Sequence, residues 1–449
     1  MTRPDRTPEQ HIYTTALCKE HLDEAAFLYA QCRHLLRGAA GPWPNAQRFE
    51  QRLAAHLEAL MIEGRTALDA CMPRMDSTDP GDLYTATRIF CRSERNDLAG
   101  RILDNLAPEN ENKFSAVCSA LVHEARTNPQ QVLDILAAHP AQLLATATVA
   151  ADARLNDAWP LVTASLKQPA RTLARVARLC GRIHNTGAVH MLTQALDHQD
   201  RKVRHQAALA LLRLGNAHDV IQHARSLQTP ILAIGLAGGP SEAAFLIGLA
   251  KSAPITRDIV TSLGLLGEIS ALTVLVEALD RKELSESAAL ALELITGAGL
   301  KENLFIPDPL NPKALFKEEL EKHEQGESPY PPGKTPGVAT DRLSQNPDHW
   351  RQWIDENHRR FSPGTRYRNG NPYCPQGLIE TLQSPAAPQW IRQLAHEELV
   401  IRYQKDIPFE AHWPASFQIQ AIEAYQHWRK AQHTSFDPGR WYFAGRRMT

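Results

Sequence analysis

Residues 187–215 read GAVHMLTQALDHQDRKVRHQAALALLRLG, and this stretch decides the fold. Its aliphatic residues recur at helical spacing in two runs, one before Asp197 and one after Val203. We expect Asp197 to turn the chain between the two helices and Gly215 to end the second helix in a left-handed conformation. A similar unit follows at 271–292, where ALTVLVEALD precedes SAALAL. The chain therefore repeats a pair of short helices.

Glycines that are expected to end helices recur along the same region. Gly181, Gly215, Gly267 and Gly297 are separated by 34, 52 and 30 residues, and the longest gap contains a further glycine pair at 238–239. A period of roughly 30 to 40 residues with two helices in each unit is typical of an α-solenoid. The alternative is a helical bundle without repeats. We predict an all-α superhelix with an additional helical region at the C-terminus.

The motif A-V-x-x-L-x-x-A-L-D followed by V-R-x-x-A-A-x-A-L-x-x-L-G, as it stands at 188–215, resembles the HEAT repeat in its short, lyase-type bacterial variant. The resemblance extends to 260–297 and, more weakly, to 45–180. It implies a HEAT-like α-α superhelix. In such arrays the second helix of each pair, which ends in Leu-Gly, lines the concave surface.

The composition excludes several broad classes of protein. The 449 residues carry 49 Lys and Arg against 50 Asp and Glu, and this net charge of −1 argues against a globally basic nucleic-acid-binding protein. The first residues lack the apolar core of a signal peptide, and no apolar run is long enough to span a bilayer. The seven cysteines form no C-x-x-C pair, so we expect neither a disulfide framework nor a zinc site. These features predict a cytoplasmic protein with no membrane partner.

Shifts in composition divide the chain into four predicted regions. A helical segment at 1–44 ends at Gly-Pro-Trp-Pro, and the solenoid covers 45–300. Residues 301–347 are rich in proline and charge, which predicts a linker or long excursion with one short helix near 314–323. Residues 348–449 form the predicted C-terminal helical region, which ends in a tryptophan-rich extension.

Four arginines on one predicted helix are spaced 4, 3 and 4 residues apart, so they share one face of that helix. If the second helices line the concave surface, this stripe faces the groove and would attract an acidic partner protein. Two further arginines flank the stripe. They lie in the second helix of the following pair and in the residues just before it. The predicted partner-binding residues are Arg171, Arg175, Arg178, Arg182, Arg204 and Arg213.

Two other interpretations of the stripe stay open. In the first, the stripe is a solvated helix face whose arginines pair within the chain, with partners from the acidic stretch at 276–327. Alternatively it binds DNA, as the basic concave groove of HEAT-like DNA glycosylases does. The neutral total charge and the lack of aromatic residues between the arginines disfavour nucleic acid as a partner.

The C-terminal region offers a second candidate surface. Trp350 and Trp353 lie on one face of a predicted helix, and Arg366 and Tyr367 follow on a turn. In one interpretation these aromatic residues dock the region onto the last repeat and cap the solenoid. In the other, the four residues form an exposed binding patch. We favour docking, because two tryptophans at helical spacing are usually core residues.

Three His-Glu pairs, which begin at His123, His323 and His396, are the candidate metal-binding residues. A HEAT-repeat family of iron-dependent deoxyhypusine hydroxylases uses such pairs at symmetric repeat positions, and imidazole with carboxylate suits non-haem iron. Here the pairs do not fall at equivalent repeat positions, and no phosphate-binding loop, nucleophile elbow or zinc-protease motif is present. We therefore predict no metal, no cofactor and no enzymatic activity, and a metal-dependent enzyme is the alternative.

A second resemblance rests on HLDEAAFLY at 21–29 and WIDENHRRFSPGTRYRNG at 353–370. Together with the repeats, these motifs are similar to an uncharacterised bacterial HEAT-repeat family of comparable length and order of parts. Genes of that family often lie beside type VI secretion components. The resemblance implies an accessory role as an adaptor, chaperone or immunity protein. The implied partner is a protein such as a type VI effector or a spike-associated protein, and no catalytic residues are implied.

Overall fold

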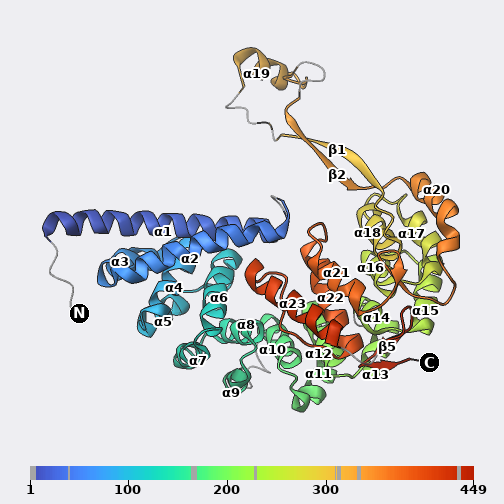
Figure 1. Cartoon of the computed structure of the whole chain (residues 1–449), viewed down its shortest axis with the longest axis horizontal. Helices are drawn as coiled ribbons and strands as arrows, with labels where there is room; N and C mark the ends of the chain where they lie inside the picture. The colour runs from blue at the N-terminus through green and yellow to red at the C-terminus, as the bar shows by residue number, and fades with distance from the viewer. Residues whose placement is uncertain are drawn as a thin grey trace. The chain divides into compact units, whose positions relative to one another are not determined.

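The computed structural model describes residues 7–38, 41–162, 169–226, 230–308, 310, 315–330, 335–431 and 436–448. These residues are mostly helical (Figure 1), and their few strands pair into two-stranded sheets. The prediction of an all-α, solenoid-like fold is confirmed. The chain divides into two compact units, one formed by 1–239 with 374–449 and the other by 240–373. None of the described helices combines the length and apolar character needed to cross a membrane.

The first unit alternates its helices between two layers. An inner row is formed by α4, α6, α8, α10, α12 and α14, which pack in succession, and α5, α7, α9, α11 and α13 pack outside it. The bounds are α1 (Pro8–Leu36), α2 (Ala46–Glu63), α3 (Arg65–Cys71), α4 (Pro80–Arg92), α5 (Asn96–Asp104), α6 (Glu111–Ala125), α7 (Pro129–Ala138), α8 (Leu143–Ala153), α9 (Trp159–Val162), α10 (Ala170–Arg182), α11 (Val189–Ala195), α12 (Arg201–Arg213), α13 (His218–Arg225) and α14 (Leu232–Ala237).

In each unit, one pair of neighbouring helices approaches closely at a glycine. A Cβ atom on Gly181 of α10 would lie 2.8 Å from the Cα atom of Ala210 in α12, so a larger residue would push the helices apart. The second unit repeats this contact, because a Cβ atom on Gly264 would lie 2.8 Å from the Cα atom of Ala291. The same packing rule therefore operates in both units.

The observed helix ends agree in part with the ends predicted from the sequence. Gly215 follows α12 with a φ of 84°, as predicted. Gly181 does not end its helix, and the left-handed residue after α10 is His184, with a φ of 51°. Asp197 lies in the turn between α11 and α12, while the side chain of Asp200 caps α12 by accepting a backbone N–H.

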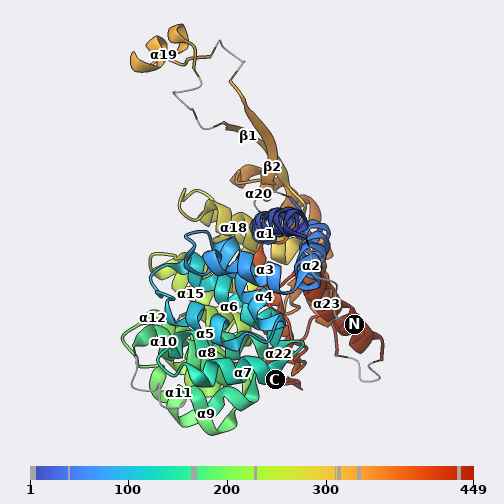
Figure 2. The same cartoon turned by 90° about the vertical axis from the view of Figure 1, so that its left-hand side faces the viewer.

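The C-terminal part of the first unit lies against the inner row. It contains α21 (Pro375–Gln383), α22 (Gln389–Tyr403), α23 (Ala415–Ala431) and a hairpin of β5 (Tyr442–Phe443) and β6 (Arg446–Arg447). Helix α22 packs on α12 and α14 (Figure 1). Helix α23 packs on α2 (Figure 2). These elements therefore cover part of the surface that the sequence assigns to an open groove.

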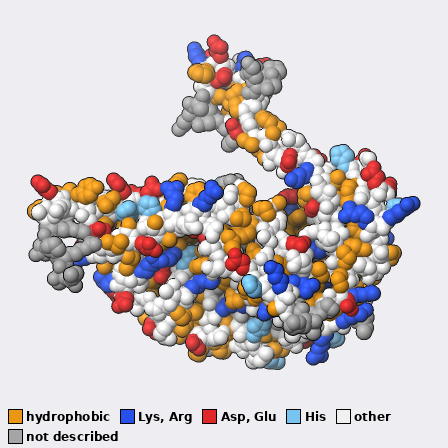
Figure 3. Space-filling model, in the orientation of Figure 1, with side chains coloured by type: hydrophobic (Ala, Val, Ile, Leu, Met, Phe, Trp, Pro, Cys, Tyr) orange, Lys and Arg blue, Asp and Glu red, His pale blue; other side chains and the backbone are white. Residues whose placement is uncertain are grey.

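The second unit continues the helical pairs and adds a long β-ribbon. Its elements are α15 (Pro240–Ser252), α16 (Arg257–Leu266), α17 (Leu272–Ala278), α18 (Ser285–Thr296), β1 (Lys301–Pro307), α19 (Lys317–Glu324), β2 (Gly337–Leu343), α20 (Pro347–Asn357), β3 (Tyr367–Arg368) and β4 (Asn371–Pro372). Strand β1 pairs antiparallel with β2 and carries exposed apolar side chains such as Phe305 and Ile306. Figure 3 shows apolar side chains along this ribbon. Two segments of the predicted linker thus pair as a β-ribbon. The predicted short helix corresponds to α19, although its first residue, Ala314, lies outside the described residues.

The two units do not follow the predicted regions. The predicted solenoid at 45–300 is divided at 239/240, and the predicted C-terminal region at 348–449 is divided at 373/374. Helix α20 belongs to the second unit, whereas α21, α22 and α23 belong to the first. Residues 1–6 of the predicted N-terminal segment lie outside the described residues.

Candidate anion-binding site

A buried ion-pair cluster joins the predicted arginine stripe to the C-terminal helices. Arg182 Nη2 lies 2.8 Å from Glu397 Oε1, and Arg182 Nε lies 2.6 Å from Glu410 Oε1. Arg213 Nη1 lies 2.7 Å from the other oxygen of Glu397. The members of the cluster are Arg154, Arg178, Arg182, Arg213, Asp152, Glu397, Asp406 and Glu410.

The carboxylates of this cluster are held in the ionised form. Burial raises the pKa of Glu397, but Arg182 and Arg213 more than offset it and hold this pKa well below its usual range. Arg182 and Arg213 are each only 5% exposed. These two arginines therefore bind the chain's own C-terminal part, and they do not face an open groove as predicted.

Arg204 and Arg171 have separate roles. Arg204 Nη1 donates to the carbonyls of His198 and Gln199 at 2.7 and 2.8 Å, which fixes the loop before α12. Arg171 stays exposed, donates to a backbone carbonyl at 2.9 Å and pairs with Glu111 at 3.3 Å. Arg204 is absent from the described pocket lining, whereas Arg171 contributes to it.

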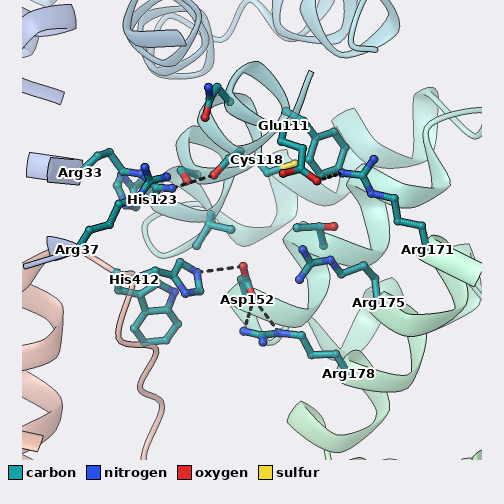
Figure 4. Close-up of a pocket in the computed structure, with 17 residues that line it drawn as sticks. Arg33, Arg37, Glu111, Cys118, His123, Asp152, Arg171, Arg175, Arg178 and His412 are labelled. Atoms are coloured by element: carbon teal, nitrogen blue, oxygen red, sulfur yellow. Dashed lines mark hydrogen bonds and ion pairs between the residues drawn. The ribbon is translucent and has the colours of Figure 1, made fainter. Parts of the chain in front are cut away.

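The part of the stripe that remains accessible lines a pocket of about 370 Å³, which we call the arginine pocket (Figure 4). Arg33 and Arg37 come from the end of α1 and lie on one wall, and Arg171 and Arg175 from α10 lie on the opposite wall. The lining is formed by Arg33, Arg37, Glu111, Asn112, Phe114, Ser115, Cys118, Ser119, Val122, His123, Thr148, Asp152, Arg171, Arg175, Arg178, His412 and Trp413.

Positive charge exceeds negative charge in this pocket. Five arginines line it against two carboxylates, Glu111 and Asp152, which leaves three uncompensated positive charges. Asp152 is already bound by Arg178 at 2.8 Å and by His412 Nε2 at 3.2 Å. Burial raises the pKa of Asp152, yet Arg178 and His412 outweigh it and lower this pKa. The charges on the walls are therefore available to an incoming anion.

Arg175 is the central residue of the pocket. Its guanidinium points into the cavity (Figure 4) and makes no hydrogen bond or ion pair with the described residues. Burial and the neighbouring Arg178 together lower its pKa more than the nearby Asp152 raises it. A cation that is partly desolvated without a partner gains more from an anion than a fully hydrated one does.

Two titratable groups of the pocket are held in their neutral forms. Burial and the charge of Asp152 raise the pKa of the Cys118 thiol, so this thiol stays protonated. Burial and the nearby Arg88 hold the pKa of His123 well below its usual range, so this imidazole is neutral. Neither group therefore changes the excess of positive charge in the described lining.

The second predicted surface is largely buried within its own unit. Trp350 is fully buried and donates to the carbonyl of Ser344 at 2.7 Å. Arg366 donates from Nε to the carbonyl of Leu266 at 2.7 Å, and the Tyr367 backbone N–H donates to Gly267 at 2.8 Å.

Of the four residues of this second surface, Trp350, Trp353, Arg366 and Tyr367, only Trp353 is partly exposed. These contacts agree with the favoured docking interpretation and do not support the alternative of an exposed patch.

The His-Glu pairs do not form a metal centre among the described residues. Glu124 pairs with Arg88 and Arg92, and Glu397 belongs to the buried ion-pair cluster. His396 lies 3.0 Å from the carbonyl of Ile407, and the pair at 323–324 is exposed on α19. Within the described ranges, no group of three or more His, Cys, Asp or Glu side chains could hold a metal ion. All seven cysteines lie among the described residues, and none of them forms a disulfide bond.

Comparison with protein-family models, with curated proteins and with solved structures finds no match to this chain.

Sequence reasoning missed the residues that complete the site. Arg33 and Arg37 sit at the end of an ordinary amphipathic helix, and Asp152 and His412 carry no motif. One signal was present: Glu397 lies within the apolar run LAHEELVIRY, and a carboxylate at a buried helical position requires a cationic partner. That partner could have been sought among the arginines of the stripe.

Proposed function

We propose that the chain is a non-enzymatic binding scaffold that holds an acidic partner protein in the arginine pocket. The observation that carries the proposal is Arg175, whose unpaired guanidinium points into a pocket with excess positive charge. Arg171 and Arg178 contribute from the same helix, and Arg33 and Arg37 contribute from the opposite wall. Arginine guanidinium groups bind carboxylates through two parallel hydrogen bonds, which gives such a pocket specificity for acidic side chains.

The proposal is tested by capture of partners from the native host with matched charge variants. Arg175→Glu reverses the central charge of the pocket. Arg65→Glu makes the same change on α3, where the side chain is 94% exposed and remote from the pocket. An acidic protein that binds the wild type and Arg65→Glu but not Arg175→Glu supports the proposal. Retention of every partner by Arg175→Glu contradicts it.

The accessory role in type VI secretion is part of the proposal and rests on the sequence resemblance alone. An adaptor or chaperone for an effector or spike-associated protein would form a stable complex with it on co-expression. An immunity protein would in addition protect cells against that effector. A cytoplasmic location also belongs to the proposal, and seven cysteines that form no disulfide bond support it.

The two alternative functions predict different results. A metal-dependent enzyme would contain stoichiometric iron after purification, which metal analysis measures directly. A DNA-binding protein would retard a DNA probe in a gel at low salt, and its affinity for the probe would fall steeply as the salt concentration rises. Either result would count against the proposed protein-binding scaffold.

A further inference from the structure

A second cavity adjoins the arginine pocket within the first unit. It has a volume of about 440 Å³ and lies among α1, α2, α4, α6 and the start of α23. The two cavities share Arg33, Ser119, His123 and His412 in their linings, so they are immediate neighbours. We call the second one the aromatic cavity.

The aromatic cavity differs from the arginine pocket in chemistry. Its lining includes the stacked rings of Tyr29 and Tyr84, with centroids 4.0 Å apart, and the ring of Phe417. Three leucines, Leu36, Leu53 and Leu57, add aliphatic surface. The cavity therefore offers an apolar and aromatic wall to a side chain of similar character.

The charges around the aromatic cavity are largely satisfied. Arg88 and Arg92 pair with Glu124. Glu50 accepts the backbone N–H of Ser416 at 3.0 Å at the start of α23. Arg88, Arg92 and Glu50 therefore offer little to a second anion, and Arg33 and Arg126 are the cationic lining residues without an ion pair among the described residues.

Arg126 links the two cavities. Its guanidinium lies 3.8 Å from the ring centroid of Phe417 and 5.2 Å from that of Trp413, which lines the arginine pocket. The side chain is exposed and makes no ion pair with the described residues. It presents a flat stacked surface at the rim between the acid-binding and the aromatic part.

We infer that the acidic ligand is an extended peptide segment with two acidic side chains followed by an aromatic or large aliphatic side chain. This inference rests on the proposed function. The acidic side chains enter the arginine pocket, where Arg33 and Arg175 bind them from opposite walls. The aromatic side chain enters the aromatic cavity beside Phe417.

The placement of the arginines favours a peptide over a nucleotide. Arg33 and Arg37 lie on one wall and Arg171 and Arg175 on the other (Figure 4), so the charges do not converge on one point. Two separate carboxylates match this spacing better than one compact phosphate group does.

The test uses the full-length protein and fluorescein-labelled peptides in a fluorescence polarisation assay. Each peptide carries two Glu residues followed, after one to three Gly residues, by Phe. Matched peptides replace Phe by Ala, or both Glu residues by Gln. The protein variants are Arg175→Gln, Phe417→Leu and the control Arg65→Gln, and thermal melting confirms that each is folded. If Phe417→Leu does not fold, the exposed Arg126→Ala takes its place.

We expect the loss of Phe from the peptide to weaken binding to the wild type by about tenfold. The same loss should have little effect on Phe417→Leu, because the two changes remove one contact. Conversely, replacement of the peptide's Glu residues by Gln should weaken binding to Arg175→Gln less than it weakens binding to the wild type. This pattern of paired effects supports the inference.

Three results would overturn it. If the peptides with Phe and with Ala bind equally while the Glu residues still matter, the bipartite ligand is wrong and the acid-binding scaffold stands. If no peptide binds, or if Arg175→Gln has no effect, the inference and the proposed function fail together. If AMP or inorganic phosphate displaces the peptide at an equal concentration, the site is built for a phosphate compound.

Discussion

Arg182 and Arg213 belong to the same stripe as Arg175 but have a different environment. Their guanidinium groups share the carboxylate of Glu397, and all three side chains are less than 5% exposed. Desolvation of such charges is costly and is offset only when each finds its partners. The loss of one partner leaves the others buried and unpaired.

We expect Glu397→Gln to lower the free energy of unfolding by about 3 kcal/mol, because it removes the negative charge between two buried arginines. Urea denaturation followed by circular dichroism measures the change. Glu423→Gln is the matched control, since Glu423 is exposed on α23 and its replacement should change little. An unchanged midpoint for Glu397→Gln would show that the cluster is not a major source of stability.

His396 gives the first unit a specific pH dependence. Burial lowers the pKa of this histidine from 6.5 to about 4, although Glu397 and Asp406 oppose the change. The unfolded chain therefore binds a proton at a higher pH than the folded chain does. We expect about 3 kcal/mol of stability to be lost as the pH falls from about 6.5 to about 4.

Urea denaturation at a series of pH values checks this expectation. The carboxylates of the cluster have lowered pKa values, so their contribution is lost only at still lower pH, below their unfolded range near about 4. The His396→Gln variant should show a shallower dependence between pH 6.5 and 4. An identical slope in this variant would assign the effect to another group.

At the residue scale, the sequence identified the arginines but not their partners. The spacing of the stripe is a local property of α10, which a single sequence reveals. Arg213 and its partner Glu397 are 184 positions apart, and no local pattern connects residues at that separation. Burial of Arg182 and Arg213 follows from that long-range contact, so it was missed.

At the scale of elements, glycine sets the distance between neighbouring inner helices. Gly264→Ala would place a Cβ atom 2.8 Å from the Cβ of Ala291 as well as from its Cα. We expect a loss of about 1–3 kcal/mol in unfolding free energy, because the backbones of α16 and α18 must separate. Thermal melting of the full-length protein measures it.

Gly248→Ala is the internal control for this experiment. Gly248 lies within α15 of the same unit, and nothing lies within 4 Å of a Cβ atom built on it. The exchange should be neutral or stabilise the helix by up to about 1 kcal/mol, since alanine is the better helix former. Equal effects at the two positions would mean that the close approach of α16 and α18 is not constraining.

The same scale shows which elements the sequence predicts. The pair α11 and α12 follows from the repeated Leu and Ala positions at 187–215, because helix periodicity is a local signal. The ribbon of β1 and β2 was not predicted, since each strand is short and its partner lies beyond a long proline-rich insertion. Its stability depends on pairing across that insertion.

At the scale of the first unit, the C-terminal helices complete the inner surface of the array. They supply Glu397, Asp406 and Glu410 to arginines of α10 and α12. A chain that ends at Tyr373 would leave these arginines without partners. We expect the truncated chain to lose its cooperative thermal transition.

Co-expression of residues 374–449 as a separate chain provides the control for truncation. This fragment should bind the truncated chain and restore the transition, because it returns the missing carboxylates. A truncated chain that melts like the full-length protein would show that the array is stable without its C-terminal part.

The central claim is that the arginine pocket binds an acidic ligand through Arg175, and isothermal titration calorimetry tests it most directly. A peptide with two Glu residues and a C-terminal Phe is titrated into the wild type, Arg175→Gln and the control Arg65→Gln. The account predicts that Arg175→Gln weakens binding by about tenfold, that Arg65→Gln does not, and that rising salt weakens binding to the wild type. Equal affinity of Arg175→Gln and the wild type would contradict it.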